Sequence, residues 1–246
     1  MPPERPKTCI EGTADTSNQD KCTAPKEEAL KAVQSGRESL NRFSADGAYT
    51  LAQLKSLPSY SRYCGYAGNN KQKITPEQYL RDFFPKDQIG TIRIGNVNPN
   101  LLPNGAKRGE ELKCAWYVSK VLGLDWQSGF TESAPMLFAG LVKSGGLLVP
   151  NPKDLKEGDV IFEKGTFGEG PSKDDHAITH VGIVLKKWEE NGKQKILFRH
   201  HSGSVSGVMT SEIELDSSKF DRQFYAGVRN SQITAQLAAL DKSKIV

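Results

Sequence analysis

Hydrophobic residues in the first part of the chain recur at intervals of three or four, the spacing of one face of a helix. Three helices are predicted from this spacing: residues 25–43, 51–57 and 75–84. The last begins at a capping box, in which Thr75 and Gln78 can each accept a hydrogen bond from the other's backbone N–H. A short strand over 89–94 and a loop rich in Pro, Asn and Gly over 96–109 follow. We therefore expect a mostly helical N-terminal region, residues 1–105, packed on the rest of the chain.

Beyond this region the pattern changes to short helices followed by β-branched runs. Cys114 opens a helical segment with hydrophobic residues at i+4, i+7 and i+8, so the thiol is expected on the buried side. A second helix is predicted over 133–146. Strands are predicted over residues 160–162, 179–185 and 196–202. An Asn-Gly pair at 191–192 predicts a hairpin turn between the last two strands. These elements indicate an α+β core over residues 106–246, with an antiparallel sheet packed against the Cys114 helix.

The candidate chemistry of this core rests on Cys114 and His180. A thiol in the first turn of a helix lies at the positive end of the helix dipole, which favours the thiolate. His180 opens the β-branched run VGIV, and a strand there can hold its imidazole against the start of the helix. A thiol activated by a fixed imidazole is sufficient for nucleophilic acyl transfer. The alternative is that Cys114 only packs in the core and that His180 bonds to backbone.

A third side chain should orient the imidazole and fix its tautomer. The strand ILFRHHS offers two histidines on opposite faces, because side chains alternate along a strand. Ile196 and Phe198 are the better core residues, and His200 continues their face, whereas His201 shares a face with Arg199. We therefore predict that His200 lies within hydrogen-bond distance of His180, with His201 as the fallback.

A metal site is the competing use of these groups. Six side chains of ligand type lie in this region: Asp174, Asp175, His176, His180, His200 and His201. In a strand, residues i and i+4 lie about 13 Å apart, so His176 and His180 would not share one ion without a turn. We therefore expect no metal and no other cofactor.

Composition narrows the class of protein further. The net charge of +4, from 33 basic and 29 acidic residues, is too small to indicate a nucleic-acid partner. No apolar run approaches the roughly 18 residues of a membrane span, and the start, MPPERPKTC, has no apolar stretch of a signal peptide. Cys9 and Cys22 lie in a polar leader that a disulfide would order, which indicates an oxidising compartment; the alternative is two free thiols.

Six segments follow one another in a set order: KCAWYVSKVLG, SAPMLFAGLVKSGG, DLKEGDVIF, THVGIVL, ILFRHHS and FDRQFYAGVRN. This order, over residues 108–230, resembles the NlpC family of papain-like cell-wall cysteine peptidases. The resemblance implies a papain-like core in which Cys114 is the nucleophile, His180 the base and a polar residue of the next strand the third member. The chain departs from the family at Lys113 and Ala115, since the family has Asp-Cys-Ser around the nucleophile.

The family also uses an upstream tyrosine to hold its substrate. Tyr63 and Tyr66 are candidates for this role, with Tyr60 as a further one. Trp116 is another candidate for substrate binding, although its spacing favours the core. The polar, Gly-rich segment 163–176 is expected to be a hairpin loop beside the base and a candidate substrate lid.

The resemblance implies an endopeptidase that cleaves peptidoglycan stem peptides, between γ-D-glutamate and diaminopimelate, through a thioester. We therefore expect an extracytoplasmic protein, periplasmic or secreted, whose signal peptide is absent from this chain. Delivery as an antibacterial effector, with an immunity protein as partner, also fits. Two other classes stay open. One is an N-acetylmuramoyl-L-alanine amidase or a transferase with the same Cys–His chemistry, and the other is a non-catalytic wall-binding module.

Overall fold

The computed structural model describes seven ranges of the chain: residues 46–56, 75–83, 92–101, 114–124, 133–164, 178–202 and 207–240. Several predictions made from the sequence lie outside these ranges. They are the helix over 25–43, the pairing of Cys9 with Cys22, the substrate-binding tyrosines Tyr60, Tyr63 and Tyr66, and most of the candidate lid.

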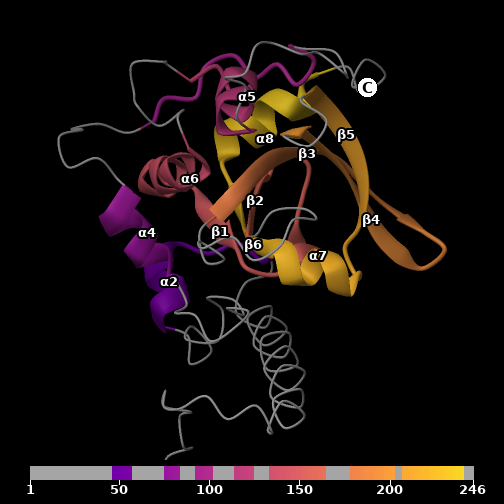
Figure 1. The fold of residues 1–246 in the computed structure, drawn as a ribbon, viewed down its shortest axis with the longest axis horizontal. Helices are drawn as coiled ribbons and strands as arrows, with labels where there is room; N and C mark the ends of the chain where they lie inside the picture. The colour runs from indigo at the N-terminus through magenta and orange to yellow at the C-terminus, as the bar shows by residue number, and fades with distance from the viewer. Residues whose placement is uncertain are drawn as a thin grey trace, which may run out of the picture.

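A six-stranded antiparallel sheet forms the centre of the protein, in the order β1-β6-β2-β3-β4-β5 (Figure 1). Its strands are β1 Leu147–Val149, β2 Val160–Lys164, β3 Ile178–Glu190, β4 Lys193–Ser202, β5 Gly207–Glu214 and β6 Phe224–Arg229. The strands β2, β3 and β4 are neighbours, as the hairpin pattern of the sequence predicts. The fold is therefore α+β with an antiparallel sheet.

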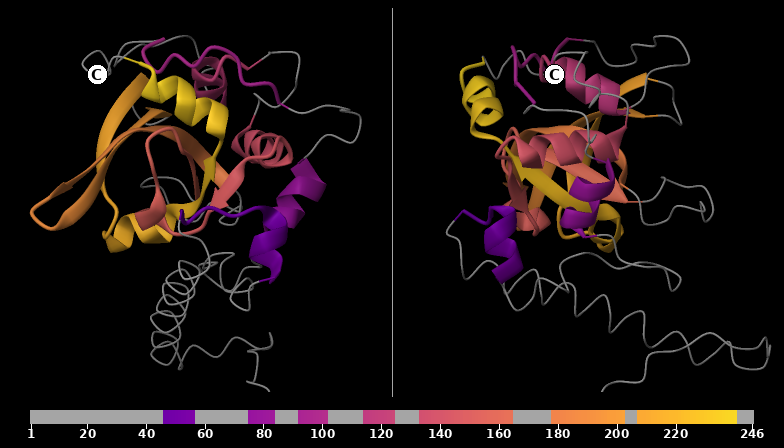
Figure 2. Two further views of the ribbon diagram at one scale, coloured as in Figure 1. Left: turned by 180° about the vertical axis from the view of Figure 1, so that it is seen from behind. Right: turned by 90° about the vertical axis from the view of Figure 1, so that its left-hand side faces the viewer.

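Helices surround this curved sheet, with α5 and α7 on opposite sides of it (Figures 1 and 2). They are α2 Leu51–Ser56, α4 Pro76–Phe83, α5 Cys114–Val121, α6 Ala134–Lys143, α7 Ser218–Gln223 and α8 Ser231–Ala238, with the short 3₁₀ helix η4 Pro152–Asp154. None of the helices in the described ranges is long and apolar enough to cross a bilayer.

Two hydrophobic clusters cover the two faces of the sheet. The larger cluster joins α5 and α6 to one face, through residues such as Val118, Phe138 and Val181. The smaller one joins α7 to the other face, through residues such as Phe198 and Phe220. Because helices cover both faces, the central strands are buried on both sides.

This double burial corrects one sequence-based argument. Ile196 and Phe198 do face a core, as predicted, but the opposite face of β4 is not a solvent face. Arg199 is 1% exposed and His201 is 4% exposed. Arg199 is accommodated because its Nε donates to the hydroxyl of Tyr117 on α5 at 2.9 Å.

Local signals in the sequence predicted several elements correctly. The capping box opens α4, where the Gln78 N–H donates to Thr75 Oγ1 at 3.2 Å and the Thr75 N–H donates to Gln78 Oε1 at 2.7 Å. The turn between β3 and β4 has positive φ at both Asn191 and Gly192, as a two-residue hairpin of this type requires. These elements depend on neighbouring residues, which is why the sequence reveals them.

Other predictions were wrong in their extent. Ile92 and Ile94 are buried but belong to no strand, since they pack beside α5 and α8 as irregular chain. β2 continues through Lys164, so the start of the predicted loop at 163 is strand. A helix, α7, occupies the beginning of the segment predicted as the last strand, and β1 and β5 were not predicted.

The described part of the N-terminal region belongs to the same core as the sheet. Tyr49 pairs with Leu148 of β1 through an antiparallel bridge. Tyr79 of α4 lies edge-on to Phe138 of α6, and its hydroxyl accepts a hydrogen bond from the Ile178 N–H at 2.7 Å. The start of β3, two residues before His180, is therefore held from the N-terminal region.

A buried ion pair between Arg229, the last residue of β6, and Asp159, the residue before β2, lies against the N-terminal region. Arg229 donates from Nε to Asp159 Oδ1 at 2.9 Å and from Nη2 to Asp159 Oδ2 at 2.8 Å. The remaining guanidinium hydrogens reach the carbonyl oxygens of Asp46 and Asp154, each at 2.7 Å, and the carboxylate of Asp46 at 3.0 Å. Since Asp159 is fully buried, this bidentate pair compensates the loss of its hydration.

Removal of one partner of this pair should destabilise the protein strongly. Arg229→Met leaves the Asp159 carboxylate buried without a counter-ion, which should lower the free energy of unfolding by about 3–5 kcal/mol. Asp216→Asn is the control, because its ion pair with Lys153 is exposed and its loss should cost less than about 1 kcal/mol. Urea unfolding at neutral pH measures both. Equal, small losses in the two variants would contradict the anchoring role.

Candidate active site

The thiol of Cys114 lies at the first residue of α5, against the backbone that flanks His180. Its Sγ lies 3.8 Å from the carbonyl oxygen of Thr179, and it also has a backbone hydrogen bond from Val181. Val118 and Val121 of α5, and Leu122 directly after it, are fully buried and hold the helix on the sheet. The predicted position of the thiol, on the buried side at a helix start, is confirmed.

The protonation of this thiol differs from the sequence-based expectation. Burial raises the pKa of Cys114 above its ordinary value and is the largest influence on it. The backbone N–H groups of Val181, Ala115 and Cys114 lower the pKa, and the last two belong to the start of the helix. The charge of Glu163 raises it. The helix start does favour the thiolate, but the loss of hydration outweighs it, so the resting group is a neutral thiol.

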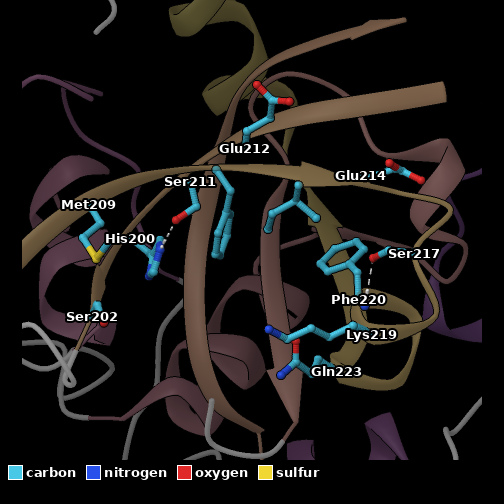
Figure 3. A pocket seen from close by; sticks show the side chains of 12 residues that line it. His200, Ser202, Met209, Ser211, Glu212, Glu214, Ser217, Lys219, Phe220 and Gln223 are labelled. Carbon is cyan, nitrogen blue, oxygen red and sulfur yellow. Dashed lines mark hydrogen bonds between the residues drawn. The ribbon is translucent and has the colours of Figure 1, made fainter. Parts of the chain in front are cut away.

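A chain of hydrogen bonds runs across three neighbouring strands. His180 Nε2 of β3 lies 2.8 Å from His200 Nδ1 of β4. His200 Nε2 lies 3.1 Å from Ser211 Oγ of β5 (Figure 3). If each imidazole keeps its proton on Nε2, His180 donates to His200 and His200 donates to Ser211. That choice leaves His180 Nδ1 without a proton, the form that a general base needs.

The choice between the two histidines of β4 is confirmed as a contact. His200 bonds to His180, as strand alternation predicts, whereas His201 lies on the other face. Both ring nitrogens of His201 are buried without a hydrogen-bond partner among the described residues. His201 still acts at a distance, since its charge is one of the influences that lower the pKa of His180.

Both bonded imidazoles are neutral at ordinary pH. Burial lowers the pKa of His180 to about 3, with smaller effects from the charges of His200 and His201. Burial likewise lowers the pKa of His200 to about 4, with a smaller effect from the charge of His201. The cluster on this face therefore holds neutral rings in the resting state.

The thiol and the imidazoles occupy different sides of β3. Val181 and Ile183 share the larger cluster with α5, whereas the His180 ring lies edge-on to Phe198 of the smaller cluster, with 6.2 Å between centroids. Within the described residues, the hydrogen bond of the thiol runs to the Thr179 carbonyl rather than to an imidazole. The expected contact between thiol and imidazole is therefore not made. Direct proton transfer therefore needs another arrangement of the site, in which the imidazole and the thiol lie on the same side of β3.

The remaining candidates from the sequence have plainer environments. Trp116 is half-buried and packs against the larger cluster, with Lys120 Nζ 5.4 Å from its ring centroid. In the described ranges, no group of three or more His, Cys, Asp or Glu side chains is arranged to hold a metal ion. Asp174, Asp175 and His176 lie outside those ranges.

Two further polar residues of the site were missed at the level of sequence. Ser211 became part of the hydrogen-bond chain because β5 pairs with β4, and that pairing joins residues far apart in the sequence. Glu163 lies opposite His180 in the pairing of β2 with β3. The β-branched residues Val208, Thr210 and Ile213 are the signal that would have predicted β5 and hence Ser211.

A pocket of about 360 Å³ opens beside the hydrogen-bond chain (Figure 3). Its wall includes His200 and Ser211, and its apolar lining includes Phe198, Met209 and Phe220. The pocket lies on the face of the sheet that carries the imidazoles, away from α5.

Comparisons of the chain with protein-family models, with curated proteins and with solved structures find no match. The function therefore has to be proposed from the site and from the order of motifs along the chain.

The two histidines should make the fold sensitive to acid. Their folded pKa values lie below the ordinary 6.5, so the unfolded chain binds more protons once the pH falls below 6.5. Stability that is complete above pH 6.5 is lost as the pH falls toward the folded values, by about 2 kcal/mol for each histidine near pH 5. Urea unfolding at neutral and acid pH measures the loss. His200→Asn removes one titrating ring and should show a smaller loss; an undiminished one would contradict the assignment.

Proposed function

We propose that the chain is a cysteine hydrolase with a papain-like, NlpC-type core, which cleaves amide bonds in peptidoglycan stem peptides. One observation carries the proposal: His180 lies on β3, the strand whose backbone contacts the thiol of Cys114, and its imidazole is hydrogen-bonded to that of His200 on the neighbouring strand β4. A nucleophile at a helix start and a base oriented by a third group are the parts that thiol-dependent acyl transfer needs.

The reaction would proceed through a thioester. In the active arrangement, with the His180 ring beside the thiol, Cys114 gives its proton to His180, and the thiolate attacks the carbonyl carbon of the substrate. The backbone N–H of Cys114, at the start of α5, is the natural donor to the oxyanion. His180 then gives the proton to the leaving amine, and water hydrolyses the thioester. His200 and Ser211 support this cycle because they fix the tautomer of His180.

The substrate class rests on the order of motifs rather than on the geometry. The resemblance to the NlpC family favours the bond between γ-D-glutamate and diaminopimelate, and an extracytoplasmic site of action. An antibacterial effector with an immunity protein as its partner is another form of this proposal. An N-acetylmuramoyl-L-alanine amidase or a transferase would use the same residues.

A second candidate, a non-catalytic wall-binding module, is favoured by one specific observation. The resting thiol bonds to a carbonyl, its pKa is raised, and the imidazoles are neutral and face the other side of β3. In such a module Cys114 would serve packing alone. The two candidates differ in whether the protein hydrolyses peptidoglycan and loses that activity when the Cys114 thiol is removed.

Cys114→Ala should abolish hydrolysis while the fold persists. The full chain is incubated with defined muropeptides, and mass spectrometry of the products identifies the bond that is cut. We expect a loss of at least about a thousandfold, because the nucleophile is removed. Lys120→Ala, on the same helix, is the control and should keep its activity. Undiminished turnover by the Cys114 variant would reject the thiol mechanism, and cleavage beside muramic acid would favour the amidase.

Substitution of the two histidines of β4 should have unequal effects. His200→Ala removes the ring that orients His180 and should lower kcat by about tenfold or more. His201→Asn should leave kcat nearly unchanged, since His201 makes no hydrogen bond to His180. Ser211→Ala removes only the outer bond and should fall between them. A larger loss for the His201 variant than for the His200 variant would show that the bonded pair is not the working one.

A further inference from the structure

Glu163 is a buried acid that the proposed mechanism does not use. It lies in β2, is fully buried, and both of its carboxyl oxygens lack a hydrogen-bond partner among the described residues. An ionised carboxylate without a partner is very costly to bury. Burial accordingly raises the pKa of Glu163 to about 8, so the group is largely protonated at neutral pH. An apolar residue would fill the same space without this cost.

The pairing of the strands sets Glu163 beside the site. On one side it lies opposite His180 of β3, and on the other side opposite Phe224 of β6. Residues opposite one another in an antiparallel pair share a face of the sheet. His200 of β4 lies opposite Gly182, two residues further along the same face of β3, so Glu163, His180 and His200 share one face across three adjacent strands.

The other elements packed on β2 define its charged neighbours. The thiol of Cys114, at the start of α5 on the other side of the sheet, has a pKa that the charge of Glu163 raises. On β6 the facing residue is apolar. On α7 the ionisable side chains described are Lys219, which is exposed, and Asp221, which is half-buried. The groups of the site that can respond to Glu163 are therefore His180 and Cys114.

We propose that Glu163 is a positioning residue of the cysteine site, whose carboxyl group acts through Cys114 and His180 and sets the pH at which the thiol ionises. The idea deepens the proposed function and rests on it. When Glu163 gives its proton to solvent, its negative charge opposes the thiolate on Cys114 and favours the imidazolium on His180. At neutral pH the carboxyl group holds its proton and has no such effect; once it ionises, near pH 8, its charge delays the ionisation of the thiol to higher pH.

The rate of Cys114 alkylation by iodoacetamide, measured against pH on the full chain, tests this proposal. Peptide mapping by mass spectrometry separates Cys114 from the other cysteines. In Glu163→Gln the midpoint of the alkylation profile should move down by about 1 pH unit, because the charge that opposes the thiolate is gone. Glu163→Asp keeps the charge and should keep the later midpoint. Glu189→Gln removes an exposed carboxylate of β3 and should change nothing.

An unchanged midpoint in Glu163→Gln would overturn the proposal, and slower alkylation at every pH with the same midpoint would show a structural role alone. If that variant does not fold, Glu163→Met removes the charge with a side chain suited to burial. If neither folds, the wild-type profile decides, since it should be broader than the titration of a single group. Alkylation needs no hydrolysis. A shifted midpoint in a chain that leaves muropeptides intact would therefore keep the role of Glu163 and reject the peptidase.

Discussion

The placement of both imidazoles depends on the absence of a side chain at Gly182. A Cβ there would lie 2.5 Å from the ring of Phe198, so that ring occupies the space above the glycine. From this position Phe198 stacks on His200, with 4.8 Å between centroids, and meets the edge of His180. The glycine is also the residue that pairs with His200 across β3 and β4. Backbone pairing and ring packing therefore enforce the same register, and the hydrogen bond between the imidazoles follows from it.

Burial, more than any single charge, decides the resting state of this site. The start of α5 and the backbone of β3 lower the pKa of Cys114, yet loss of hydration raises it further. The same loss keeps His180 and His200 neutral and Glu163 protonated. Burying neutral groups costs little free energy, whereas a buried thiolate or imidazolium would need a partner of opposite charge. In the proposed mechanism, that partner would come either from an arrangement that brings the His180 ring to the thiol or from a polar group of the substrate.

How much of the structure could be predicted from the sequence depends on how far apart along the chain the interacting residues lie. A capping box, an Asn-Gly turn and strand alternation involve residues within a few positions of one another, so α4, the β3–β4 hairpin and the choice of His200 were predictable. Ser211 was not, because its role arises when β5 is added to the edge of the sheet. The burial of Arg199 was not either, since it depends on α5 lying over that face and on the hydroxyl of Tyr117. Glu163 was predicted to start a loop, because a charged residue after a short apolar run normally marks the end of a strand.

The strand β2 has a buried acid near each of its ends, and the two have opposite solutions. Asp159, just before the strand, is matched by Arg229 through two hydrogen bonds, so its charge is retained and ties three parts of the chain together. Glu163, four residues later, is equally buried and has no such match within the described residues. The fold requires the pairing of Asp159 with Arg229, since removing either residue would leave the other charge buried without a partner. The fold does not require an acid at Glu163, because an apolar side chain would fill the same space at a lower cost in free energy. The unmatched acid is therefore best explained by the groups beside it, His180 and Cys114, whose proton it can influence.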